Sequence, residues 1–66
     1  MFARRLKELR TEKNLTQAAL AAVLNVDRTA VIKWENGERE TSFAMLIKIA
    51  DYFDVTLDYL LGRTMY

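Results

Sequence analysis

One local pattern occurs three times in the chain and marks the starts of three short helices. An apolar residue stands directly before a residue with a capping oxygen and five positions before a second apolar residue. In this arrangement the oxygen accepts a hydrogen bond from the first helical turn, and the two apolar side chains pack across the cap. Each copy fixes where a helix begins and the angle at which the chain enters it. The copies are Leu15-Thr16 with Leu20, Val26-Asp27 with Val31, and Val55-Thr56 with Leu60.

Two further helices are indicated by apolar residues at helical spacing. The first covers the N-terminal residues and is expected to end near Asn14, a residue type that tolerates the left-handed conformation at a helix stop. The second is expected to start at Ser42. The last helix of the chain is short, from Leu57 to Leu61, and is expected to stop at Gly62. The apolar stripes are Phe2, Leu6 and Leu9 in the first helix and Leu46, Ile49, Ala50 and Phe53 in the one that starts at Ser42.

Composition supports an all-α fold in a single domain. The chain has 66 residues, with no proline and only two glycines, whereas a sheet of this size needs more turn residues. A chain of this length holds one core, close to the lower limit at which a core is self-sufficient. We therefore expect one domain over residues 1–66, a bundle of five helices with short connections.

The residue types present exclude several classes of function. Without cysteine or histidine, the chain lacks disulfides and the usual zinc ligands, and no catalytic arrangement is recognisable. We expect no metal, no cofactor and no enzymatic activity. No apolar run reaches the length of a membrane span and no signal-peptide pattern is present, so the cytoplasm is the expected location.

Charge is unevenly distributed along the sequence, although the net charge is only +1. Residues 1–16 carry five basic and two acidic side chains, a balance of +3, whereas residues 51–66 carry one basic and three acidic ones, a balance of −2. This polarity suits a protein that turns one end toward phosphates. It suits an ordinary solvated surface equally well.

Residues 17–36 combine two of the short helices into one unit. Ala21 is small enough for two helices to cross closely, and Asn25 stands at the turn, where a positive φ is expected. Two short helices joined by such a turn predict a helix-turn-helix. The inward-facing residues are Leu20, Ala21 and Leu24 on the first helix and Val31 and Trp34 on the second.

The outer face of the second of these helices carries candidates for contacts with DNA bases. Arg28 lies in the first turn, whereas Thr29 and Lys33 lie opposite the inner face, with Ile32 at its margin. Arginine and lysine suit guanine O6 and N7, while threonine and isoleucine can meet the thymine methyl group. Ile32 fits an isolated surface apolar residue equally well. Gln17 begins the preceding helix, where its amide and backbone N–H can meet a phosphate.

Most of the chain carries a family resemblance. Its segments are Arg5-Leu6-Lys7-Glu8-Leu9-Arg10, Leu15-Thr16-Gln17, Leu20-Ala21, Leu24-Asn25-Val26, Val31, Lys33-Trp34-Glu35-Asn36-Gly37, Leu46-Ile47-Lys48-Ile49-Ala50 and Leu57-Asp58-Tyr59-Leu60-Leu61-Gly62. Together they resemble the lambda-repressor-like, Xre-type helix-turn-helix domains of phage repressors and bacterial regulators. The resemblance implies a five-helix lambda-repressor-like bundle with the helix-turn-helix at helices 2 and 3. It also implies that the third helix reads the major groove of double-stranded DNA, commonly as a homodimer on a near-palindromic operator.

The resemblance further implies roles for single residues. An arginine and a glutamate at the positions of Arg10 and Glu35 often pair across the first and third helices, which would fix the relative position of the two helices. The alternative for Arg10 is a phosphate contact. Asn25 replaces the usual turn glycine, which we expect to matter little. The positions that contact bases in the family match Arg28, Thr29, Ile32 and Lys33, and those that hold phosphates match Gln17 and Asn36.

The loop after Gly37 departs from the family pattern. Glu38-Arg39-Glu40-Thr41 stands where relatives usually have basic residues and a proline. Because two carboxylates repel phosphates, we expect Arg39 alone to contribute a backbone contact from this loop. We therefore expect modest affinity for DNA and a shallow dependence of that affinity on salt.

Two functions remain open from the sequence. The first is a transcriptional regulator, with repression through occupation of an operator as the expected mode. Its homodimer interface is expected at Tyr59, Met65 and Tyr66, because the apolar side chains near the C-terminus exceed what a small core can hide. The second is a protein-interaction module, such as an antitoxin or an adaptor with weak DNA binding. Glu38, Glu40 and the acidic C-terminal third favour this alternative.

Overall fold

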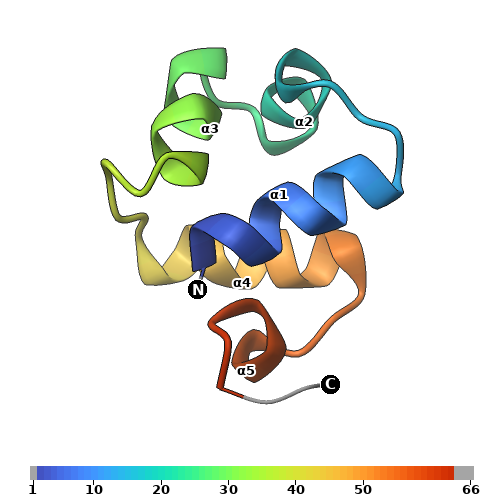
Figure 1. Cartoon of the computed structure of the whole chain (residues 1–66), viewed down its shortest axis with the longest axis vertical. Coiled ribbons are helices and arrows are strands. Elements are labelled where there is room, and N and C mark those ends of the chain that lie inside the picture. Colours follow the sequence, from blue (N-terminus) through green and yellow to red (C-terminus); the bar gives the residue numbers. More distant parts are fainter. Residues whose placement is uncertain (1, 64–66) are drawn as a thin grey trace.

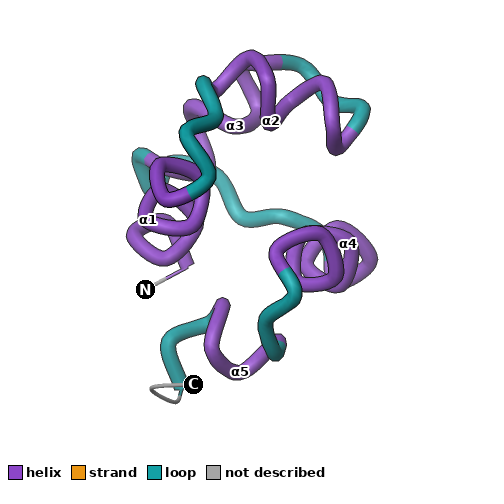
Figure 2. Tube along the Cα trace, turned by 90° about the vertical axis from the view of Figure 1, so that its right-hand side faces the viewer, coloured by secondary structure: helices purple, strands orange, loops and turns teal. Residues whose placement is uncertain are grey.

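The computed structural model describes residues 2–63, which contain five helices and no strand. The helices α2 and α3 form one end of the domain and α5 lies at the other, with α1 and α4 between them (Figure 1). Figure 2 shows the same order after a quarter turn. The all-α prediction is confirmed. The bounds are Phe2–Glu12 for α1, Gln17–Leu24 for α2, Arg28–Glu35 for α3, Phe43–Phe53 for α4 and Leu57–Leu60 for α5.

Side-chain caps start three of the helices. The side-chain oxygens of Thr16, Ser42 and Thr56 each accept a hydrogen bond from the backbone N–H three residues further on, at 3.0, 3.1 and 3.0 Å. Asp27 occupies the N-cap position of α3, but its side chain makes no capping hydrogen bond, so the predicted capping contact is wrong there. The Asp27 carboxylate still stands at the helix end where the dipole favours a negative charge.

The apolar residues of the three cap patterns lie in the core. Leu20, Val31 and Leu60 are completely buried, and the apolar residues before the caps pack against the same cluster. Within this arrangement α2 packs on α3, α1 contacts α3 and α5, and α4 contacts α5. Residues that fix the helix starts therefore also form part of the core. The buried set is Leu6, Leu9, Leu20, Ala21, Leu24, Ala30, Val31, Trp34, Ile49, Ala50, Phe53 and Leu60.

Left-handed residues turn the chain after several helices. Asn14 and Asn25 have φ values of 58° and 60°, so the predicted turn conformations are confirmed. Asp54, which the sequence pattern did not single out, does the same after α4 with φ of 56°. Asparagine and aspartate adopt this region more readily than other non-glycine residues, because their short polar side chains hydrogen-bond locally. The connections between helices can therefore be short without proline and with few glycines.

We expect Asn25→Ala to lower the free energy of unfolding by about 1 kcal/mol, since alanine is strained in the left-handed region that this turn requires. Asn25→Gly should leave stability unchanged or raise it slightly, because glycine has no Cβ to strain. Urea unfolding followed by circular dichroism measures both. Equal stabilities of the alanine and glycine variants would contradict the left-handed assignment of this turn.

Candidate nucleic-acid interface

The helix α3 has one apolar and one polar face. Ala30, Val31 and Trp34 are buried against the rest of the domain, which fixes the rotation of the helix about its axis. The small size of Ala30 therefore has a packing reason. The residues predicted to contact bases lie together on the opposite side. Of these, Arg28, Thr29 and Lys33 are exposed and Ile32 is half-buried at the margin.

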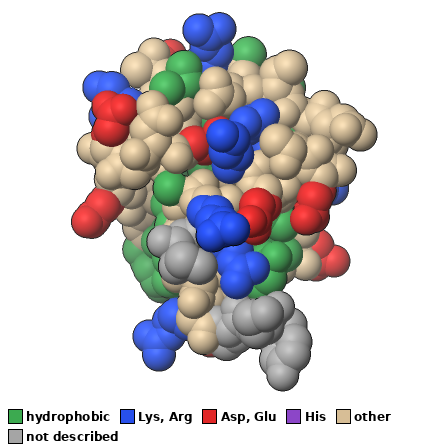
Figure 3. Space-filling model, viewed as in Figure 1, with side chains coloured by type: hydrophobic (Ala, Val, Ile, Leu, Met, Phe, Trp, Pro, Cys, Tyr) green, Lys and Arg blue, Asp and Glu red, His purple; other side chains and the backbone are tan. Residues whose placement is uncertain are grey.

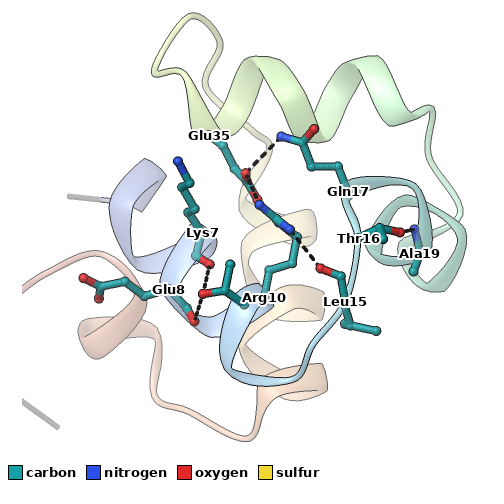
Figure 4. A network of polar contacts seen from close by, with 9 residues as sticks. Lys7, Glu8, Arg10, Leu15, Thr16, Gln17, Ala19 and Glu35 are labelled. Atoms are coloured by element: carbon teal, nitrogen blue, oxygen red, sulfur yellow. Dashed lines mark hydrogen bonds and ion pairs between the residues drawn. The ribbon is translucent and has the colours of Figure 1, made fainter.

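The side chain of Glu35, at the end of α3, points into the protein and is paired with Arg10 of α1 (Figure 4). The Arg10 Nε donates to Glu35 Oε2 at 2.7 Å and Nη2 donates to Oε1 at 3.0 Å. Only 11% of the Arg10 side chain and 2% of the Glu35 side chain are exposed. Nη1 of Arg10 donates to the Leu15 carbonyl at 2.8 Å, which ties the connection between α1 and α2 to the same pair. The guanidinium is thus directed into the protein and not toward a phosphate.

The ion pair leaves little net charge at this point of the surface. The hydrogen bonds to Glu35 raise the pKa of Arg10 above its usual value, burial opposes that shift, and the Coulomb attraction of the carboxylate adds to it. Arg10 therefore stays charged, and its positive charge balances the carboxylate of Glu35.

Gln17, predicted to meet a phosphate, joins the pair from α2. Its Nε2 donates at 3.1 Å to Glu35 Oε1, the oxygen that also accepts from Arg10 Nη2. Figure 4 shows the amide oxygen of Gln17 pointing away from Glu35. The first N–H groups of a helix have no intrahelical partner. In α2 the Thr16 hydroxyl accepts a hydrogen bond from one of them, the N–H of Ala19. The start of α2 therefore still offers hydrogen-bond donors to an anion.

Asn36, the other predicted phosphate contact, also donates to a carboxylate. Its Nδ2 lies 3.1 Å from Glu38 Oε2, and both residues are exposed. Within residues 2–63 Glu38 takes part in no ion pair, in contrast to Glu35. Arg39 follows in the same exposed loop and lines an open cleft together with Trp34. The negative charge of Glu38 thus stands uncompensated beside a predicted phosphate site.

Most basic side chains of α1, and that of Lys13 directly after it, contact groups of the same chain. Figure 3 shows acidic and basic side chains intermixed over the visible face. The uneven charge along the sequence therefore produces a mixed surface on this side, and the structure favours the solvated-surface interpretation of it. The contacts are Arg4 Nε to Glu8 Oε2 at 3.3 Å, Arg10 to Glu35, Arg5 at 4.2 Å from the Tyr59 ring centre, and Lys13 Nζ at 5.4 Å from the Tyr52 ring centre.

The residues predicted for a dimer interface lie at the C-terminal end. Tyr59 is half-buried on α5 and packs against the core, with the Arg5 guanidinium over its ring. Met65 and Tyr66 lie outside the described residues. The helix α5 is at the end of the domain away from α2 and α3 (Figure 1). An interface at α5 would therefore leave the exposed face of α3 uncovered.

Residues 2–63 contain neither a membrane-spanning helix nor a metal-binding cluster. No helix in this range combines the length and the apolar character needed to cross a bilayer. The same range contains no cluster of three or more histidine, cysteine, aspartate or glutamate side chains placed to hold a metal ion.

Comparison with known proteins agrees with the fold and with the arrangement of α2 and α3. The chain is 48% identical over 61 residues to the HTH-type transcriptional activator BcrR of Enterococcus faecalis, covering 92% of this chain and 30% of BcrR. The restriction-modification controller protein C.AhdI from Aeromonas hydrophila superposes with a TM-score of 0.80 and 39% identity, covering 89% of each chain. The DNA-binding domain of the P22 C2 repressor superposes with a TM-score of 0.84 and 28% identity, covering 92% of this chain and 80% of that one.

The family model described as helix-turn-helix matches residues 6–60, which include every described helix in whole or in part. Within that range the two short helices, the left-handed turn at Asn25 and the buried inner face of α3 are those of a helix-turn-helix. The chain belongs to the lambda-repressor-like, Xre-type helix-turn-helix family.

Proposed function

We propose that this chain is a sequence-specific, double-stranded DNA-binding transcriptional regulator that represses by occupying a near-palindromic operator as a homodimer. The observation that carries the proposal is the exposed face of α3, on which Arg28, Thr29 and Lys33 lie together while the opposite face is buried. A helix held in this way can enter a major groove with a fixed set of side chains. The proposal places the protein with its operator in the cytoplasm.

Base recognition is assigned to the exposed face of α3. Arg28 and Lys33 can donate to guanine O6 and N7, and Thr29 and Ile32 can contact a thymine methyl group. The relatives support regulation of transcription as the outcome, since BcrR is named an activator and the P22 C2 protein a repressor. Repression is the simpler mode for a domain of this size, because occupation of the operator alone achieves it.

Backbone contacts are assigned to Gln17, Asn36 and Arg39. Two of these are neutral amides and only one is a cation, so few counterions would be released from the DNA on binding. We therefore propose that each subunit shows a shallow decrease of affinity with salt. Such contacts set the register of the protein on the duplex and carry no sequence information.

A homodimer is part of the proposal because one domain of this size covers about one half-site. Tyr59, Met65 and Tyr66 are its proposed interface. The exposed part of the Tyr59 ring would take part while its other contacts stay within the subunit.

Selection of bound sequences from a random duplex pool tests the proposal, with the mass of the complex measured in parallel. We expect a symmetric enriched motif and two chains per duplex. The absence of any enrichment at low salt would overturn the regulator proposal. One chain per duplex would overturn the homodimer.

The second candidate is a protein-interaction module, such as an antitoxin or adaptor, with weak DNA binding. The Asn36–Glu38 contact favours this alternative, because the amide of Asn36 donates to the exposed carboxylate of Glu38. The first proposal needs the same amide for a DNA phosphate. A partner protein would then bind the acidic loop, and DNA contacts by Arg28 and Lys33 would be dispensable.

Replacement of Glu38 by glutamine is expected to raise the affinity for DNA about threefold to tenfold. The substitution removes an uncompensated carboxylate that occupies the Asn36 amide and repels phosphates. Fluorescence anisotropy with a labelled duplex at two salt concentrations measures the change, and the gain should shrink at the higher salt because the repulsion is screened. Glu12→Gln, on α1, is the control for a general loss of negative charge. Equal gains for the two variants would argue against a local role of Glu38.

A further inference from the structure

We propose that Glu35 is a positioning residue for DNA binding, which holds the amide of Gln17 in the orientation that meets a phosphate. The inference deepens the proposed function and rests on it. Glu35 itself does not touch DNA in this proposal. It acts through the hydrogen bond that links the last residue of α3 to the first residue of α2.

The geometry brings three helices to one carboxylate. Arg10 from α1 holds both oxygens of Glu35, and Gln17 from α2 donates to Oε1 (Figure 4). Only 2% of the Glu35 side chain is exposed, and its carboxylate accepts two hydrogen bonds from Arg10. Glu35 is therefore a fixed hydrogen-bond acceptor for Gln17. A glutamine side chain that is otherwise free to rotate loses that freedom when it binds a ligand, which weakens binding. The contact with Glu35 restricts the side chain before DNA arrives.

The carboxylate also determines which end of the amide faces α3. A glutamine amide has two donor hydrogens on nitrogen and an acceptor oxygen, and only the nitrogen end can hydrogen-bond to Glu35. The amide oxygen, which would repel a phosphate, is directed elsewhere. One N–H of Gln17 is used by Glu35 at 3.1 Å, and the nitrogen retains a second N–H for a phosphate oxygen.

Charge balance allows a carboxylate to take this role. An unpaired glutamate next to a phosphate site would repel the ligand, but Arg10 neutralises Glu35 through two hydrogen bonds. Glu38 provides the contrast within the same chain, since it also accepts from an amide but takes part in no ion pair of the described residues. We infer a positioning role only for Glu35.

A double-mutant cycle on DNA affinity tests the inference, with Gln17→Ala and Glu35→Leu made singly and together. The probe is a mixed-sequence duplex at low salt, because phosphate contacts do not depend on sequence. In the wild-type background Gln17→Ala should weaken binding about tenfold, as expected for a hydrogen bond to a charged group. In the Glu35→Leu background the same substitution should weaken binding about twofold or less, since leucine has no acceptor to hold the amide. The dependence of affinity on salt should not change with Gln17→Ala, because a neutral amide releases no counterion.

Two controls separate positioning from a general effect. Gln17→Ala should still cause about a tenfold loss in a Glu38→Gln background, because Glu38 does not contact Gln17. Circular dichroism establishes that each variant is folded under the assay conditions. An equal loss on Gln17→Ala in the wild-type and Glu35→Leu backgrounds would overturn the inference alone. Absence of DNA binding by the wild-type chain would overturn the proposed function together with the inference.

A measurement on the wild-type protein keeps the test valid if Glu35→Leu fails to fold. Side-chain 15N relaxation reports the order of each amide in the absence of DNA. We expect the Gln17 Nε2 group to have an order parameter of about 0.85, the value of a rigid backbone. The exposed side-chain amides of Asn14 and Asn25 should have order parameters below about 0.6. A Gln17 amide as mobile as those two would overturn the inference.

Discussion

Replacing Arg28 and Lys33 together by alanine is expected to abolish recognition of the selected duplex while leaving the fold intact. Both side chains are exposed on the outer face of α3, so their removal opens no cavity in the core. Each bidentate contact with a base contributes about 1–3 kcal/mol of discrimination, and the two act in every half-site. We therefore expect a loss on the order of a thousandfold per half-site. Fluorescence anisotropy with the selected duplex and a scrambled one measures it.

The comparison with Arg4→Ala makes this test specific. Arg4 is also a cation, its side chain is 77% exposed, and it belongs to α1 and not to α3. Its removal should reduce binding to the selected and scrambled duplexes by a similar small factor. The double variant should instead bring the selected duplex down to the level of the scrambled one. Retention of full selectivity by the double variant would refute base recognition by Arg28 and Lys33, and would favour the interaction-module alternative.

The substitution Leu20→Ala is expected to cause the second large effect, a loss of folding stability. Leu20 is completely buried and belongs to α2, which packs against α3. Truncation of a buried leucine to alanine removes about 2–5 kcal/mol, because transfer energy is lost and a cavity remains. A core of this size supplies no more than about 3–5 kcal/mol of net stability. The variant should therefore be largely unfolded, or melt some tens of degrees lower, as measured by circular dichroism on heating.

Val23→Ala is the matched control on the same helix. Val23 is 41% exposed, so its truncation should lower the free energy of unfolding by about 0.5 kcal/mol or less. Both substitutions replace an aliphatic side chain by alanine in α2, and alanine has a higher helix propensity than either leucine or valine. Equal destabilisation by the two variants would mean that Leu20 does not lie at the centre of the core.

Local chemistry explains why most of the fold could be predicted. A capping hydrogen bond joins residues three positions apart, and a left-handed turn depends on a single residue, so Thr16 and Asn25 reveal their roles in the sequence. The exception is Asp27, which has the same sequence context but makes no capping hydrogen bond. Asp54 was missed because an aspartate at a helix end resembles any surface aspartate.

The candidate site was predictable only in part. The outward residues of α3 followed from helical periodicity, because burial of Val31 and Trp34 fixes the opposite face. The pairing of Arg10 with Glu35 followed from the family resemblance and not from any periodic pattern. The hydrogen bond from Gln17 to Glu35 spans 18 positions and was not foreseen. Nothing in the spacing of these residues brings them together, since their meeting depends on how α1, α2 and α3 pack.

The sequence by itself determined where the helices begin, where the chain turns, and which side of α3 faces solvent. Helix starts and turns depend on interactions within one or two helical turns, and the outward side of α3 follows from the helical spacing of its apolar residues. Only the tertiary structure decided which polar groups remain available for a ligand. It placed the cations of α1 against carboxylates and a tyrosine ring. It gave Gln17 a carboxylate partner that Arg10 neutralises, and Asn36 a carboxylate partner that takes part in no ion pair of the described residues. Hydrogen bonds and ion pairs require atoms within a few ångström of each other, and for residues on different helices that distance is set by packing alone.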